Sequence, residues 1–253
     1  MSLSPFLKAS VALHAAAVPA LAIAPHRWPY VAGALIANHY VTIAGGLLPR
    51  SSLLGPNLRR SAAAEAAGSV VLTFDDGPDP VVTPAILDAL DARGAKATFF
   101  CIGEHAARHR ALTAEIAQRG HRVENHSYTH RNGFFFHLPR TLDSEIERCQ
   151  EELLRASGRT PSFFRAPAGV RSPLLESALL RNGLRLASWT RRGFDTVSRD
   201  PEAVARRLLR GLRAGDVLLL HDGACGAPPA RPRIVLQALP LILDAIDAAR
   251  LRA

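Results

Sequence analysis

The stretch Val70-Val71-Leu72-Thr73-Phe74-Asp75-Asp76-Gly77-Pro78 joins an apolar run to two adjacent carboxylates. The apolar run is typical of a buried strand, and Asp, Gly and Pro favour the turn that follows it. Two like charges side by side are unfavourable unless neighbouring groups give them different roles. The stretch is therefore either an ordinary acidic turn or a site where one carboxylate binds a metal ion and the other accepts a proton.

From this stretch to the end of the chain, strand patterns alternate with helix patterns. Strands are expected at residues 70–74, 97–102, 121–125, 162–165, 184–189 and 217–221. Helices are expected at residues 83–93, 106–119, 142–156, 173–181, 201–213 and 234–250. Repeated βα units of this kind predict an α/β fold with a parallel sheet, a distorted (β/α) barrel or an open sheet. The chain ends in a helix pattern without a final strand, so the barrel is expected to be open at one seam.

In a parallel sheet the groups that follow the strands gather at one edge, where ligands bind. His126 and His130 follow the third strand at i and i+4, a spacing that lets both imidazoles face one ion if the segment forms a helical turn. Together with Asp76 they would provide three ligands and leave positions open for water and substrate. Asp75 would then be free to act as a base. Two surface histidines and an acidic turn remain the alternative.

Two further strand ends carry ionisable groups. Arg165 ends the apolar run Phe163-Phe164, and a buried guanidinium there requires a carboxylate partner, whether for catalysis or for scaffolding. His221 ends the apolar run Leu218-Leu219-Leu220. It is either a hydrogen-bonded core histidine or a general acid.

Residues 73–78, 126–130, 165–169 and 218–221 resemble, in this order, the motifs of the polysaccharide deacetylase family (NodB-homology group, carbohydrate esterase family 4). The resemblance extends over residues 70–223 and implies hydrolysis of N-acetyl groups on amino sugars with a divalent metal ion, expected to be zinc. It implies these roles: Asp75 as catalytic base, Asp76, His126 and His130 as metal ligands, Arg165 as the residue that orients the base, and His221 as general acid. Leu219 would line the acetyl-methyl pocket, Trp189 would also bind the substrate, and the Ala168 N–H would bind the oxyanion.

The chain departs from the family pattern at two positions. Ala168 stands where an aromatic residue is frequent, which keeps the backbone donor but changes the rim of the substrate groove. The family also has an acidic pair, followed by tryptophan, that tunes the acid histidine, whereas this chain has Arg192 at the position that most resembles the tuning carboxylate. Either Asp195 replaces that carboxylate or another group tunes His221.

The first sixty residues differ from the rest and are expected to form a hydrophobic helical segment (1–60) ahead of a catalytic domain (61–253). Two uncharged runs, residues 9–25 and 31–48, flank a break that contains Trp28 and Tyr30. A membrane hairpin, a signal peptide or anchor, and an extra soluble helical pair are the three interpretations. Membrane attachment, to a bacterial-type inner membrane, is favoured. The flanking basic residues favour both ends on the cytoplasmic side, although the side of the catalytic domain stays open.

Composition excludes some alternatives. The net charge of +9 is carried almost entirely by arginines scattered over helix patterns, so no nucleic-acid partner is expected. The three cysteines show no CxxC spacing, and no GxSxG nucleophile motif occurs. The expected function is removal of N-acetyl groups from a polysaccharide or glycoconjugate, with no protein partner predicted. The alternatives are a deacetylase or deformylase of a lipid-linked amino sugar, and a non-catalytic carbohydrate-binding protein of the same fold.

Overall fold

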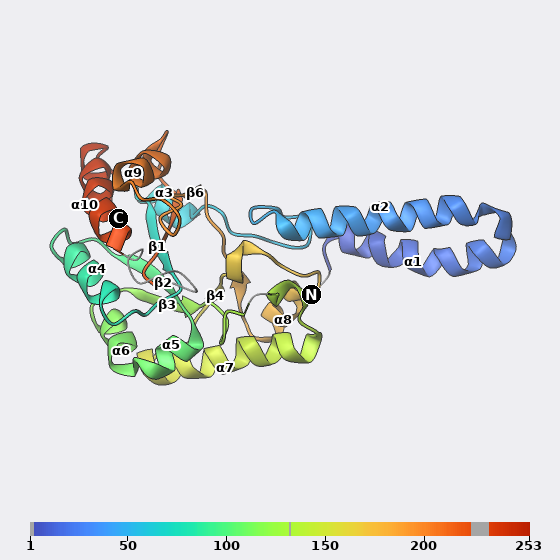
Figure 1. Ribbon diagram of the computed structural model, residues 1–253, viewed down its shortest axis with the longest axis horizontal. Coiled ribbons are helices and arrows are strands. Elements are labelled where there is room, and N and C mark those ends of the chain that lie inside the picture. The colour runs from blue at the N-terminus through green and yellow to red at the C-terminus, as the bar shows by residue number, and fades with distance from the viewer. Residues whose placement is uncertain (1–2, 132, 224–232) are drawn as a thin grey trace.

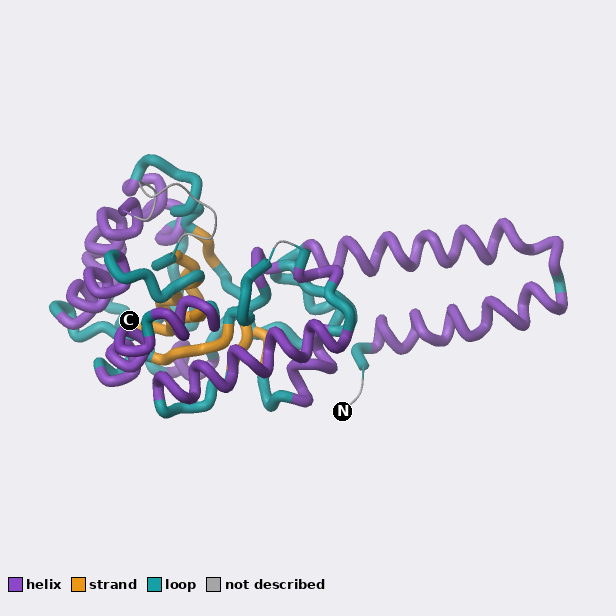
Figure 2. Tube along the Cα trace, turned by 60° about the horizontal axis from the view of Figure 1, so that its bottom comes forward, coloured by secondary structure: helices purple, strands orange, loops and turns teal. Residues whose placement is uncertain are grey.

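The computed structural model describes residues 3–131, 133–223 and 233–253, which form a curled parallel sheet with helices on its outer face (Figures 1 and 2). The strand order is β5-β4-β3-β2-β1-β7-β6, and every pairing is parallel. The strands are β1 (Val71–Asp75), β2 (Ala97–Cys101), β3 (Arg122–Asn125), β4 (Phe163–Phe164), β5 (Arg185–Leu186), β6 (Arg191–Arg192) and β7 (Val217–His221). The sheet is thus a half-barrel with edges at β5 and β6, as the parallel βα pattern predicts.

The outer face of the sheet is covered by helices. They are α4 (Val82–Asp91), α5 (Gly103–Arg108), α6 (Arg110–Gln118), α7 (Pro139–Ser157), α8 (Leu175–Arg181), α9 (Pro201–Leu209) and α10 (Arg233–Ala248). The short helix α3 (Ala62–Ala66) instead lines a cleft with Val71 and Thr73 of the concave side. Alternate strand residues such as Leu72, Phe74 and Leu218 pack against these helices in the main core. The intervening residues of the same strands face the concave side, where a smaller cluster joins Leu219 to Trp189.

Most element boundaries shift by a few residues from the sequence-based expectation, and three differences change the number of elements. The strand expected at residues 184–189 is replaced by two strands of two residues each, β5 and β6, because the chain leaves one edge of the sheet and re-enters at the other. The helix expected at residues 106–119 divides into α5 and α6 at His109, whose φ of −122° and ψ of 50° are not helical. The small-residue stretch 61–69 contains the short helix α3.

The segment before β1 lies across the seam between the two sheet edges. Leu58 forms a bridge to Ala187 beyond β5, and Arg60 forms one to Asp216 ahead of β7. The Arg60 guanidinium also lies 2.6 Å from the Asp216 carboxylate. Residues 58–60 therefore connect the β5 edge with the start of β7, the neighbour of the β6 edge, and form part of the catalytic-domain fold.

The N-terminal residues form a helical hairpin, α1 (Pro5–Ile23) and α2 (Trp28–Leu47), that projects away from the sheet (Figure 1). The short helix η1 (Pro25–Arg27) joins the two. Apolar and aromatic side chains are widely exposed along it: Val11, Val18, Ile23, Trp28, Tyr30, Ile36, Tyr40 and Ile43. Among the described helices, α1 alone has the length and mean hydropathy of a membrane span.

The base of the hairpin is attached closely to the catalytic domain. The Arg171 N–H donates to the Gly46 carbonyl at the end of α2, and the Arg171 guanidinium donates to the Ser51 carbonyl. Gly169, at a φ of 74°, leaves space for Pro49 and Trp189, since a Cβ there would lie 2.7 Å from each. The hairpin thus begins directly beside the loop that follows β4.

Candidate metal and catalytic site

The register of the sheet places the ionisable strand ends at one edge. Asp75 at the end of β1 pairs with His221 at the end of β7. Asn125, the last residue of β3, pairs with Phe164, so His126 and Arg165 follow at the same level. Parallel strands bring their carboxyl ends together, and these side chains therefore meet at one edge of the half-barrel.

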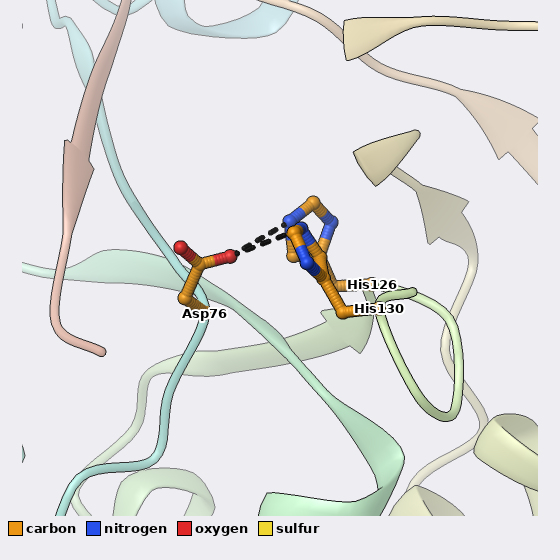
Figure 3. A group of neighbouring side chains, drawn as sticks. All are labelled: Asp76, His126 and His130. Atoms are coloured by element: carbon orange, nitrogen blue, oxygen red, sulfur yellow. Dashed lines mark ion pairs between the residues drawn. The ribbon is translucent and has the colours of Figure 1, made fainter. Parts of the chain in front are cut away.

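Asp76, His126 and His130 form a compact cluster (Figure 3). The Nε2 atoms of His126 and His130 each lie 3.3 Å from Asp76 Oδ1, and the three potential ligand atoms lie within 4.8 Å of one another. The expected helical turn is wrong, because residues 126–130 form a loop in which Ser127 and His130 have positive φ. The imidazoles converge through this loop geometry, and Asn125 supports it by accepting the Ser127 N–H.

The cluster is electrostatically coupled. Burial raises the pKa of Asp76, but the His126 hydrogen bond and the nearby imidazoles outweigh it and hold that pKa far below its usual range. Burial and the His126 charge lower the pKa of His130 to about 4. One anionic oxygen beside a neutral imidazole is the donor chemistry that a divalent cation requires.

Asp75 has a different partner from its neighbour. Arg165, which is 1% exposed, donates to Asp75 Oδ1 at 2.7 Å and to the Thr73 hydroxyl at 2.8 Å. The same guanidinium donates to the Ser188 carbonyl and lies 4.0 Å from the Phe100 ring centroid. Burial lowers the pKa of Arg165, and the Asp75 charge opposes that effect. The carboxylate partner predicted for Arg165 is confirmed, and this pair fixes the orientation of Asp75.

His221 is held by Asp195 through two contacts. Asp195 Oδ1 lies 2.9 Å from His221 Nδ1, and Asp195 Oδ2 accepts the His221 backbone N–H at 2.8 Å. Burial lowers the pKa of His221, but the Asp195 charge and hydrogen bond outweigh it and raise that pKa to about 9. Of the two options for the carboxylate partner of His221, the structure thus places Asp195 there, whereas Arg192 lies over Trp189 and Phe194.

The three remaining sequence-predicted residues lie around this site. Ala168 is exposed on the loop after β4 with a left-handed φ of 54°. Leu219 and Trp189 pack together on the concave side of the sheet. Trp189 also contacts the Gly169 position, so it connects the Ala168 loop with β7.

Sequence reasoning set aside one residue that the structure makes prominent. Asp222 is fully buried, accepts a hydrogen bond from Thr83 at 2.7 Å, and contacts Gly77, where a Cβ would lie 2.0 Å from its carboxylate. Burial raises its pKa to about 7. The sequence shows only that Asp222 directly follows His221; its contact with Gly77 is shown by the fold alone.

Backbone strain marks the same loops. Of the six non-glycine residues with positive φ in the described chain, five lie in the loops of the site: Asp76, Ser127, His130, Ala168 and Phe194. Such conformations cost free energy and persist where the surrounding structure enforces them, typically at functional sites.

Comparison with known proteins agrees with this geometry. The polysaccharide deacetylase family model matches residues 62–187. A chitooligosaccharide deacetylase of Azorhizobium caulinodans is 34% identical over 156 residues, which cover 61% of this chain and 74% of the relative. This chain belongs to the polysaccharide deacetylase family.

Other polysaccharide deacetylase relatives support the assignment. A peptidoglycan-N-acetylglucosamine deacetylase of Bacillus cereus is 30% identical over 162 residues, covering 61% of this chain and 72% of the relative. The solved structure of a family 4 carbohydrate esterase from Streptomyces lividans, in complex with acetate, has a TM-score of 0.67 at 34% identity, covering 74% of this chain and 91% of that one. The resemblance read from four short motifs is confirmed.

The polysaccharide deacetylase site predicts a measurable titration. In metal-free protein, His221 should titrate near pH 9 by NMR, and Asp195→Asn should lower its pKa by about one unit or more, because the carboxylate that stabilises the imidazolium is removed. Asp200→Asn is the control, since Asp200 lies on the same segment and caps α9 without contacting His221. An unchanged His221 pKa in Asp195→Asn would contradict the assigned pair.

Proposed function

We propose that this polysaccharide deacetylase removes N-acetyl groups from amino sugars of a polysaccharide or glycoconjugate, with chitooligosaccharides and peptidoglycan as the substrate classes suggested by its relatives. The observation that carries the proposal is the separation of two adjacent carboxylates. Asp76 belongs to the histidine cluster, while Asp75 is held by Arg165. The two carboxylates therefore have different partners and can have different tasks.

The residues of the cluster fit a divalent metal ion. One carboxylate oxygen and two imidazole nitrogens, converging from a rigid loop and a strand end, match the ligands of catalytic zinc and leave positions for water and substrate. We therefore propose that Asp76, His126 and His130 hold zinc. An ion held there would lower the pKa of a water molecule and polarise the substrate carbonyl. The His126 Nδ1 lies 2.8 Å from the Arg165 carbonyl, which presents its Nε2 to the cluster.

Asp75 is the proposed catalytic base. Its Oδ2 lies 3.9 Å from His126 Nε2, so this oxygen faces the cluster, while Oδ1 is occupied by Arg165. Arg165 thereby orients one free carboxylate oxygen toward the position where a water proton would be taken. Arg165 is a positioning residue in this scheme, because it acts through Asp75.

His221 is the proposed general acid. The pKa of about 9 keeps its imidazole protonated at neutral pH, and Asp195 bonds Nδ1, so Nε2 can donate to the departing amine. The Ala168 N–H is the proposed oxyanion donor, a contribution of about 3 kcal/mol where such donors are removed in other enzymes. Leu219 and Trp189 are proposed to contact the acetyl methyl group.

We further propose that the hairpin of residues 5–47 attaches the enzyme to a membrane. Val18 and Ile36 are 74% and 70% exposed, and Trp28 and Tyr30 lie at the tip, a position that suits a membrane interface. The Asn38 side-chain amide donates to the Ser10 hydroxyl across the two helices, which lowers the cost of placing these polar groups in lipid. A bacterial inner membrane is the proposed location. Attachment favours the second candidate function, deacetylation or deformylation of a lipid-linked amino sugar.

An acetate-release assay tests the catalytic proposal. Full-length protein should release acetate from chito-oligomers or peptidoglycan when zinc is present, and lose this activity in chelator because the proposed ion is removed. Restoration by added zinc separates metal removal from unfolding. Binding of chito-oligomers or peptidoglycan without acetate release from either, in zinc-loaded protein, would contradict the enzyme and favour a carbohydrate-binding protein.

Membrane fractionation tests the hairpin. The wild-type chain should sediment with membranes and resist a carbonate wash. Val18→Asp together with Ile36→Asp should move it to the soluble fraction, because each charge costs about 2.5–3.5 kcal/mol at the centre of a bilayer. Val197→Asp is the matched control, since Val197 is 65% exposed on the catalytic domain. A wild-type chain that stays soluble without detergent would contradict the proposal.

A further inference from the structure

Arg192 is a cation at the position where the resemblance to the family predicts a carboxylate. On β6 it pairs with Leu219 of β7, and paired strand residues direct their side chains to the same face of a sheet. His221 lies two residues after Leu219 and therefore on the same face. The guanidinium carbon of Arg192 lies 5.8 Å from the centroid of Trp189 and 5.0 Å from that of Phe194. The cation thus stands on the concave side, next to the proposed acetyl pocket.

Arg192 has no carboxylate partner in the described chain. Its neighbour Arg191 forms an ion pair with Asp216 at 2.7 Å, and Asp195, three residues later, is occupied by His221. No ion pair or hydrogen bond of the described residues includes the Arg192 side chain, and its Nε is buried without an acceptor. Residues 1–2, 132 and 224–232 contain no Asp or Glu, so none of these stretches can supply an aspartate or glutamate to Arg192.

Arg192 is half-buried, and its buried Nε without an acceptor is unfavourable because the two aromatic rings offer no oxygen to accept this N–H. The fork of Arg donors matches the oxygens of a carboxylate or phosphate. A separate feature carries positive charge beside Trp189: this residue lines an open cleft of about 540 Å³ together with Arg50, Arg59 and Arg60, whereas Arg192 does not line that cleft. Arg60 is neutralised by Asp216, whereas Arg50 and Arg59 donate only to backbone carbonyls.

We propose that Arg192 binds an anionic group, carboxylate or phosphate, that the substrate carries next to the N-acetyl sugar. The enzyme then selects anionic amino-sugar chains or glycolipids over neutral chito-oligomers. This inference rests on the proposed deacetylase function and deepens it. Arg192 contacts the substrate at a position distinct from the reacting amide and acts on specificity.

The test compares three substrates: neutral chitotriose, a muramic-acid-containing peptidoglycan fragment that carries carboxylates, and a polyprenyl-phosphate-linked N-acetylglucosamine. Arg192→Gln should lower kcat/KM about tenfold to a hundredfold on the anionic substrate that is used, chiefly through KM, and less than about twofold on chitotriose. Arg192→Lys should recover part of the loss. Arg199→Gln, an exposed arginine of the same segment, is the control for loss of one charge.

The two anionic substrates separate the source of the anion, since a loss confined to one of them identifies carboxylate or phosphate. Equal losses on neutral and anionic substrates, or no loss on either anionic one, would overturn the inference. Calorimetric binding of the same three compounds in chelator provides a readout that needs no turnover. Absence of hydrolysis for every substrate contradicts the deacetylase, while a wild-type preference for anionic compounds that Arg192→Gln abolishes still supports Arg192 as the anion site.

Discussion

Two adjacent carboxylates at the end of a buried strand are the constraint on which the rest of the site depends. Asp75 is 3% and Asp76 7% exposed, so their charges must be balanced by protein groups or a metal ion. The fold supplies separate partners to each one, Arg165 directly after β4 for Asp75 and the two imidazoles from the loop after β3 for Asp76. The parallel sheet makes this possible because it brings three strand ends to one edge, and the positive φ of Asp76 accompanies the divergence of the two partner sets.

The part of the site around His221 also depends on a specific partner for each charged group. His221 lies opposite Asp75 in the sheet, and its charge is set by Asp195, which arrives from the loop after β6. Fully buried Asp222 lies under Gly77 and connects the β7 turn to the β1 turn. The segment that joins the hairpin to β1 bridges the β5 edge through Leu58 and the start of β7 through Arg60. The N-terminal hairpin therefore leads directly into the segment that packs beside Trp189 and Gly169.

Much of this arrangement was predictable from the sequence, and the exceptions have physical causes. Strand-end residues were found because apolar runs of four to six residues end abruptly in charged groups, as at Asp75 and His221. The loop geometry of residues 126–130 was not predicted, because the HxxxH spacing fits a helical turn as well as a loop. Only tertiary contacts impose the left-handed conformations of Ser127 and His130. β6 was missed since two arginines carry no strand signal, and they pair only because the chain crosses from one sheet edge to the other. Asp195 was one of two options, and three-dimensional proximity alone decides between them.

The central claim, that Asp76 binds the metal and Asp75 moves the proton, is tested most directly by zinc content. Asp75→Asn and Asp76→Asn differ by one position in the chain and remove the same charge, so each is the control of the other. After zinc loading and dialysis, Asp75→Asn should retain about one zinc per chain without releasing acetate, whereas Asp76→Asn should lose the zinc. Equal zinc retention in both variants, or acetate release by Asp75→Asn at the wild-type rate, would contradict the account.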